Sequence, residues 1–294
     1  MKITLLGTGT PHPSLKRASS SYMVEIGNDV LLFDHGPGAF QRLLECGVPA
    51  TRVTHVFFTH LHYDHCLDYP RLLLQRWDQG AGQIPELRVY GPPHTARMTE
   101  ALIAEDGAFG PDLRARCEQA PSVEVYRLRG GTPPRRPPRP VVEEIESGAR
   151  IDGGDWTVRA VSVPHAQPFL TCLGLRLDAP EGSFAYSGDA GPSNAFARLC
   201  ENVDVMIHMC YQISGSVPEE WAKGAAGHLE VARIAQEARA RSLVVSHIPT
   251  QMDIPGLRER LIIEMAAIYK GTIYWGEDCM TIPLTGPQGA GHRG

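Results

Sequence analysis

The chain has 294 residues, of which 43% are hydrophobic and 21% are charged, a composition typical of a globular protein that buries a substantial core. Its formal net charge of −5 lacks the basic excess of proteins that neutralise many phosphates, which disfavours nucleic acid as a partner. No stretch approaches the roughly 18 apolar residues of a membrane helix, so we expect a cytoplasmic protein with no membrane partner.

The first half of the chain alternates short apolar segments with glycine, asparagine and aspartate turns. In chain order it is predicted to form a strand over 3–6, strands over 22–26 and 30–33, a helix over 39–46, a strand over 53–58, a helix over 67–77, a strand over 87–90 and a helix over 93–104. Gly27-Asn28-Asp29 predicts a hairpin turn between the second and third strands.

A proline- and arginine-rich segment over residues 126–140 separates the two halves. Proline removes backbone donors and fixes φ, so we predict a long exposed loop that acts as a lid or a linker. Its arginines match the geometry of phosphate or sulfate oxyanions. A solvated linker is the commoner explanation of such a stretch, and we favour it.

The second half repeats the pattern of strands and helices. It is predicted to form strands over 141–146, 156–163, 170–177 and 184–186, a helix over 193–200, a strand over 203–208, a helix over 228–239, a strand over 243–246, a helix over 257–269 and a final strand pair within 272–283. Two halves of similar pattern predict an α/β protein in which two sheets pack face to face with helices outside. We assign residues 1–283 to one domain and residues 284–294 to a disordered tail.

Three histidines and an aspartate lie together in His60-Leu61-His62-Tyr63-Asp64-His65, directly after an apolar strand. A histidine-rich surface loop is the alternative explanation, but a strand end is where a loop can direct several side chains at one point. Imidazole and carboxylate groups are ligands of zinc. In His60-x-His62 both rings lie on one side of an extended segment, whereas Asp64 and His65 can face a second point. This segment therefore predicts two neighbouring metal sites.

Three more residues of metal-ligand type follow other apolar strands. They are His165, Asp189 and His247. Each alone could be an ordinary buried or turn residue. Because four separate strand ends carry such residues, we expect them to converge on one metal centre.

The histidine run resembles the H-x-H-x-D-H signature of the metallo-β-lactamase superfamily, and the resemblance extends over roughly residues 1–283. Leu6-Gly7-Thr8-Gly9-Thr10-Pro11, Leu32-Phe33-Asp34-His35-Gly36 and Gly227-His228-Leu229 with Ile234-Ala235 are similar to the tRNase Z and arylsulfatase-like branch. The resemblance implies a four-layer αββα sandwich with its site at one edge of the sheets, and a homodimer. It also implies two divalent metal ions, for which we favour zinc, with manganese or iron as alternatives.

The resemblance also implies the role of each site residue. It assigns His60, His62 and His165 to one metal, Asp64, His65 and His247 to the other, and Asp189 to both as a bridge. Two metals about 3.5–4 Å apart would acidify a bridging water into hydroxide.

Two residues are predicted to be catalytic. Asp64 would share the proton of the hydroxide, and His228 would bind the reacting oxyanion or protonate the leaving group. Asp34 would orient ligands through hydrogen bonds. The alternatives are that His228 is only a helix-start residue and Asp34 only a turn former.

Three features of the sequence depart from the tRNase Z pattern. The usual histidine-glutamate pair is His208-Met209 here, Ile248-Pro249-Thr250-Gln251 replaces the expected phosphate contacts, and no counterpart of the glycine-rich arm that grips tRNA is found. We therefore expect a dinuclear metal-dependent hydrolase of a small-molecule ester, phosphodiester or sulfate ester. The alternatives are a tRNase Z-like endoribonuclease that processes tRNA 3′ ends and a non-catalytic metal-binding module.

Overall fold

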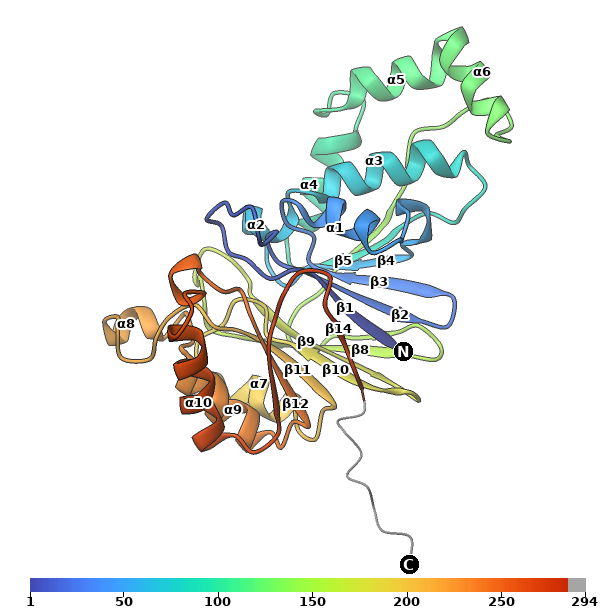
Figure 1. Cartoon of the computed structure of the whole chain (residues 1–294). Helices are drawn as coiled ribbons and strands as arrows, with labels where there is room; N and C mark the ends of the chain where they lie inside the picture. Colours follow the sequence, from blue (N-terminus) through green and yellow to red (C-terminus); the bar gives the residue numbers. More distant parts are fainter. Residues whose placement is uncertain (285–294) are drawn as a thin grey trace, which may run out of the picture.

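The computed structural model describes residues 1–284 as two β-sheets packed face to face, with helices on both outer sides (Figure 1). The predicted αββα sandwich is thereby confirmed. The predicted disordered tail over residues 284–294 lies outside the described residues, apart from Leu284. Within residues 1–284, no helix combines the length and the apolar character that crossing a bilayer requires.

The first sheet contains the amino-terminal strands and one strand from the end of the chain. In spatial order its strands are β14 (Thr281–Ile282), β1 (Lys2–Gly7), β2 (Ser21–Ile26), β3 (Asp29–Phe33), β4 (His55–Phe57), β5 (Arg88–Gly91) and β6 (Val141–Glu144). Neighbours from β14 to β3 are antiparallel, and those from β3 to β6 are parallel. The predicted hairpin joins β2 to β3, and its turn places Gly27 at φ 52°, a conformation that costs glycine little.

The second sheet is built in the same way from the rest of the chain. In spatial order its strands are β13 (Thr272–Trp275), β12 (Ser242–Ser246), β11 (Val205–Met209), β10 (Gly182–Tyr186), β9 (Leu173–Ala179), β8 (Thr157–Ser162) and β7 (Arg150–Asp152). Strands β10 to β13 are parallel. The predicted pairing of the last two strands was wrong, because β13 pairs with β12 and β14 crosses to β1 in the other sheet.

Helices cover both outer faces of the sandwich. On the side of the first sheet lie α1 (Ala39–Glu45), the 3₁₀ turn η1 (Ala50–Arg52), α2 (Tyr63–Cys66), α3 (Tyr69–Gly80), α4 (Thr95–Ile103), α5 (Gly110–Glu118) and α6 (Ala120–Leu128). On the side of the second sheet lie α7 (Asn194–Leu199), α8 (Glu219–Ala222), α9 (His228–Glu237), the 3₁₀ turn η2 (Thr250–Met252) and α10 (Leu257–Ile268).

Helices α5 and α6 extend away from the body of the molecule, and the sequence analysis did not predict them (Figure 1). The predicted loop over 126–140 was therefore wrong at its start, because its first three residues form the last turn of α6. Each of these helices has a proline in its first turn, where proline is tolerated.

The rest of that segment is a loop with mostly exposed residues, as predicted, but it is tied to helix α3 through Arg135. The guanidinium of Arg135 lies 3.9 Å from the ring centroid of Trp77 and 5.2 Å from that of Tyr126. Its Nη2 also donates a hydrogen bond of 2.8 Å to Asp78 Oδ1. Only 6% of Arg135 is exposed, so cation–π contact and ion pairing hold the loop in place.

Aromatic packing holds the two sheets together at the centre of the sandwich. Phe33 of β3 stacks on Phe57 of β4 at a centroid distance of 5.2 Å, and Phe184 of β10 meets Phe33 edge-on at 4.9 Å. All three side chains are fully buried, and each such burial contributes about 1.5–3 kcal/mol to folding. The strands that carry the predicted site residues are thereby held in fixed relative positions.

The parallel strands of both sheets direct their carboxyl ends to one edge of the sandwich. Residues that follow such strands gather in the crevice beyond them, which is the usual ligand site of an open α/β sheet. Asp34 follows β3, Asp189 follows β10 and His247 follows β12. The fold thus brings together strand ends that lie far apart in the sequence.

Candidate metal centre

All seven predicted ligands gather in two adjoining groups of potential metal donors. The first group is His60, His62, His165 and Asp189, and the second is Asp64, His65, Asp189 and His247. In each group one donor atom per residue lies within 4.8 Å of every other. Asp189 belongs to both, which is the arrangement a bridging carboxylate requires.

In the first group three imidazole nitrogens converge on one point. His60 Nε2 lies 3.0 Å from His62 Nδ1, and His165 Nε2 lies 3.3 Å from the same atom. Zinc–nitrogen bonds of about 2.0–2.1 Å in a tetrahedral arrangement place two ligand nitrogens about 3.3 Å apart. The spacing therefore fits a metal ion of that size.

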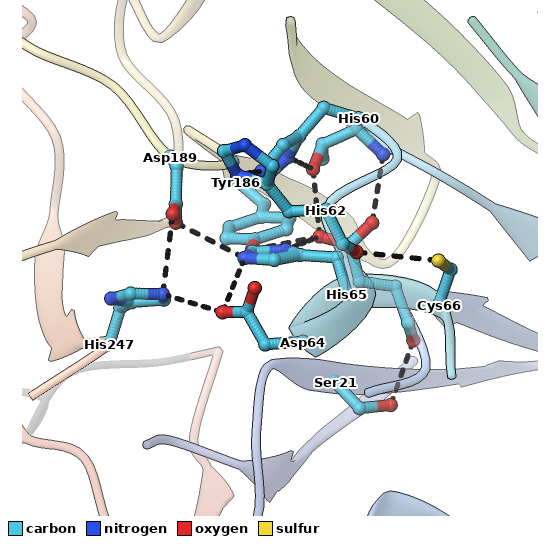
Figure 2. A network of polar contacts seen from close by, with 12 residues as sticks. Ser21, His60, His62, Asp64, His65, Cys66, Tyr186, Asp189 and His247 are labelled. Atoms are coloured by element: carbon cyan, nitrogen blue, oxygen red, sulfur yellow. Dashed lines mark hydrogen bonds and ion pairs between the residues drawn. The ribbon is translucent and has the colours of Figure 1, made fainter. Parts of the chain in front are cut away.

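In the second group, two imidazole nitrogens alternate with carboxylate oxygens (Figure 2). His247 Nε2 lies 3.3 Å from Asp64 Oδ2 and 3.3 Å from Asp189 Oδ2. His65 Nε2 lies 3.4 Å from Asp64 Oδ2 and 3.4 Å from Asp189 Oδ1. Within the described chain, His65 Nε2 and Asp189 Oδ1 are buried and have no hydrogen-bond partner. A cation between them would satisfy both atoms, so the donor set fits a second metal.

Asp34 is fully buried and fixes the orientation of the second group. Its Oδ2 accepts hydrogen bonds from His65 Nδ1 at 2.7 Å, Thr59 Oγ1 at 2.8 Å and Tyr186 Oη at 2.9 Å, and its Oδ1 accepts one from the Thr59 amide at 2.8 Å. Because Nδ1 of His65 carries the donated proton, the lone pair of Nε2 faces the centre.

Hydrogen bonds fix the first group in a similar way. Thr59 Oγ1, which donates to Asp34, lies 3.1 Å from Nδ1 of His60 and can accept its proton. Nδ1 of His165 donates to the Gly224 carbonyl at 2.8 Å. Both rings therefore present Nε2 to the centre.

Three residues at these strand ends adopt left-handed backbone conformations. Asp34 has φ 57°, His247 has φ 52° and Gly188, directly before Asp189, has φ 58°. This region is costly for residues other than glycine, although aspartate and histidine tolerate it better than most. A side chain at position 188 would also meet Thr59 at 2.8 Å. Such strain at a site is maintained only where the surrounding structure enforces it.

Burial and mutual contact shift the pKa values of the clustered groups. Burial, together with the nearby His65, holds the pKa of His60 well below its usual value, so that ring is neutral. Burial alone would raise the pKa of Asp189, but His247 and His65 hold it well below its usual range. Neutral imidazole and ionised carboxylate are the forms that bind metals.

His65 is shifted in the opposite direction. Burial disfavours its charged form, but the carboxylates of Asp189 and Asp34 raise its pKa well above the usual value. The two carboxylates thus attract positive charge to this position. A divalent cation bound beside Nε2 supplies such charge and displaces the proton.

His228 lies outside both donor groups, at the first residue of α9. It is 1% exposed, its Nδ1 accepts a hydrogen bond from the Ser214 amide at 3.1 Å, and its Nε2 donates to Glu264 Oε2 at 2.8 Å. Both ring nitrogens are therefore engaged, and the contact with the Ser214 amide leaves Nε2 as the nitrogen that donates to Glu264. The catalytic role of His228 stays a prediction.

Sequence analysis missed four parts of this site: the hydroxyls of Thr59 and Tyr186, the Gly224 carbonyl and the Glu264 carboxylate. Tyr186 had a signal, because it lies at the end of the strand that precedes Asp189. A backbone carbonyl and a glutamate on a distant helix have none. Met209, which stands where the tRNase Z pattern has glutamate, accepts a hydrogen bond from the Ala190 amide through Sδ and so supports the Asp189 loop.

Comparison with known proteins gives matches over nearly the whole chain. A family model described as the beta-lactamase superfamily domain matches residues 30–248. Ribonuclease Z from Mycobacterium bovis (strain BCG / Pasteur 1173P2) is 30% identical over 285 residues, which cover 95% of this chain and 96% of that relative.

Solved structures with the same architecture include two that span the described fold. The metallo-beta-lactamase fold protein YhfI from Bacillus subtilis has a TM-score of 0.74 at 21% identity, covering 96% of this chain and 98% of its own. The short form of human tRNase Z has a TM-score of 0.68 at 20% identity, covering 97% and 100%. At these identities the likeness shows the fold.

Proposed function

Because this chain belongs to the β-lactamase superfamily, as a hydrolase homologous to ribonuclease Z, we propose that it is a two-metal phosphodiesterase that cleaves RNA. The observation that carries the proposal is the 30% identity to a ribonuclease Z over 95% of the chain. The geometry agrees, because two adjoining donor groups that share Asp189 suit the displacement of a phosphate oxygen. Membership of a hydrolase family also counts against a non-catalytic metal-binding module.

Seven residues would hold the metals in this proposal. His60, His62 and His165 would hold one ion, Asp64, His65 and His247 the other, and Asp189 both. When bound, two divalent ions make water a nucleophile at neutral pH and neutralise charge on the phosphate. Zinc is the metal we favour, since nitrogen and oxygen donors at this spacing suit it.

Two residues would act on the reacting groups, Asp64 as a proton acceptor and His228 as a hydrogen-bond donor. Asp64 contacts His65 and His247 through Oδ2 alone, so its Oδ1 is the atom we assign to accept the proton of the attacking water. His228 would donate a hydrogen bond from Nε2 to the reacting oxyanion, which requires Glu264 to release that hydrogen. Glu264 is 41% exposed, so its side chain has room to turn away.

A second candidate is hydrolysis of a small-molecule ester, phosphodiester or sulfate ester. It is favoured by the net charge of −5, by Met209 in place of glutamate and by the uncharged segment Ile248-Pro249-Thr250-Gln251 after the last ligand. Against it stand relatives that are ribonucleases over nearly the whole chain. These homologues outweigh the charge of the chain, because a few local contacts can bind RNA without a basic overall balance.

Parallel assays on two kinds of substrate distinguish the two candidate functions. Metal-loaded protein is incubated with a precursor tRNA that carries a 3′ extension, and in parallel with chromogenic phosphodiester, carboxyl-ester and sulfate-ester substrates. We expect a single cut near the 3′ end of the tRNA, absent in Asp189→Ala. Hydrolysis of a small ester with intact precursor tRNA would instead establish the second candidate.

A further inference from the structure

Four aromatic side chains are exposed in the part of the chain that the structure describes. They are Tyr63 at 57%, Phe169 at 89%, Tyr211 at 43% and Trp221 at 69%. Large aromatic side chains are mostly buried, and exposed ones that gather in one place mark a binding surface. Their location in the fold therefore matters.

All four lie on segments that border the metal centre. Tyr63 lies between the predicted ligands His62 and Asp64. The ring of Tyr211 lies 5.7 Å from the ring of His247. Phe169 belongs to the loop that follows His165, and Trp221 of helix α8 lines a depression together with that histidine. None of these rings contributes to a hydrophobic core among the described residues.

A depression of about 450 Å³ lies directly beside the predicted ligand His165. Its other walls include Pro164, Gln167, Glu220, Trp221 and Lys223. The depression thus combines a site ligand, an exposed indole and an exposed ammonium group. This combination suits a ligand with a planar ring next to a negative charge.

Hydrogen bonds tie the segment that carries Trp221 to the loop of His165 and to the loop of Asp189. The carbonyl of Gly224 accepts the hydrogen bond from His165 Nδ1, and the amide of Ala226 donates to the Ala190 carbonyl at 3.0 Å. Ala190 directly follows Asp189. A planar group stacked on Trp221 would therefore have a defined position relative to the reacting phosphate.

We propose that this depression is a nucleotide subsite, in which the indole of Trp221 stacks on the base next to the scissile phosphodiester. Lys223 faces the phosphate of the same nucleotide. Its present partner is Glu220, at 2.8 Å, and because both side chains are more than half exposed this pair is weak enough to exchange for a phosphate. The proposal rests on the proposed RNA-cleaving function, and it assigns the subsite to a nucleobase rather than to a sugar or an alkyl group.

Kinetics with a base-free nucleotide test the proposal. Two RNA substrates are compared: one unmodified, and one with an abasic residue next to the scissile bond, placed in turn on each side. Stacking on an aromatic ring contributes about tenfold or more to binding, so Trp221→Ala should raise KM for the unmodified RNA about tenfold with kcat little changed. When the abasic residue stands on one particular side of the scissile bond, Trp221→Ala and the wild type should have the same KM.

Two further variants complete the set. Trp221→Phe should restore most of the affinity, since it keeps an aromatic face. Ile263→Ala, on the outer side of α10 and also 69% exposed, is the matched control and should change nothing. An equal loss for unmodified and abasic RNA in Trp221→Ala would overturn the proposal.

Tryptophan fluorescence gives a readout that does not depend on cleavage. Trp156 and Trp275 are buried and Trp77 is covered by Arg135, so adenosine monophosphate bound in the depression should quench Trp221. The quenching should be lost in Trp221→Ala. Quenching without RNA cleavage would contradict the proposed function and support the subsite, whereas RNA cleavage without quenching would contradict the subsite alone.

Discussion

Asp189 offers oxygens to both donor groups, and no other residue in residues 1–284 belongs to both. It is 4% exposed and lies in a loop whose conformation depends on Gly188 at φ 58°. Removal of this carboxylate therefore affects both metal positions together, whereas removal of a single imidazole affects one directly.

The first prediction concerns these ligands. Asp189→Ala and His62→Ala should each abolish hydrolysis and lower the metal content, with the larger loss of metal in Asp189→Ala. The reason is that a missing ligand leaves an incomplete coordination shell. Elemental analysis and turnover are measured on the same preparations. His12→Ala, which changes an exposed histidine, is the control. Full activity in either ligand variant would contradict the assignment.

The second prediction concerns Asp34. It belongs to neither donor group but accepts hydrogen bonds from His65, Thr59 and Tyr186. Asp34→Asn loses the charge that orients His65, so metal affinity should fall by about 10–100-fold. Titration with a competing chelator measures the metal affinity of the variant and of the wild type. Tyr186→Phe removes only one of the donors and should have a much smaller effect. Equal affinities in Asp34→Asn and the wild type would contradict this role.

At the residue scale the sequence predicted the donors and, through the family resemblance, Asp34 as a residue that orients them, but not the other supports. Metal-ligand residue types after strands, such as His165 and His247, are visible as spacing and composition. The contacts that orient them depend on side-chain directions across the two sheets, as for Tyr186 and Asp34, which lie 152 positions apart. Sequence patterns carry no information about such distant pairs.

At the scale of elements, β4 contains a buried histidine whose titration should affect stability. His55 packs edge-on against Trp156 at a centroid distance of 4.9 Å. Burial lowers the pKa of His55 from 6.5 to about 4, with Asp29 opposing the shift and Arg88 adding to it. The unfolded chain therefore takes up a proton between pH 6.5 and pH 4 that the folded protein does not bind.

The third prediction follows from this difference. As the pH falls from 6.5 to 4, the free energy of unfolding should decrease by up to about 1.4 kcal/mol per pH unit through His55 alone. His55→Gln should remove that part of the slope. Urea unfolding of the wild type and the variant across this range measures the difference, in which contributions of other groups cancel. Identical slopes would contradict the prediction, because they would show that His55 binds its proton at the same pH in the folded and the unfolded chain.

Most elements were predicted within a few residues, and the main failures have two physical causes. The elements α5 and α6 are short and mostly exposed, so they lack the apolar periodicity that identifies a packed helix. The strands β13 and β14 were recognised, but their pairing with β12 and β1 was not. Strand pairing depends on the whole arrangement of sheets rather than on local sequence.

At the scale of the whole molecule, the two sheets direct their parallel strands to one edge, and this geometry places Asp34, Asp189 and His247 together. The strand-then-helix pattern predicted two sheets in contact, and the sandwich confirms it. Assignment of residues 1–283 to one domain and assembly as a homodimer stay predictions. Light scattering on purified protein tests the dimer.

The central claim is that the fold binds two metal ions with the seven residues at this edge. Its most direct test is the metal content of folded wild-type protein, measured by mass spectrometry after loading with zinc and removal of the excess. We predict two tightly bound ions per chain. One ion or none, in protein with an intact fold, would contradict the claim.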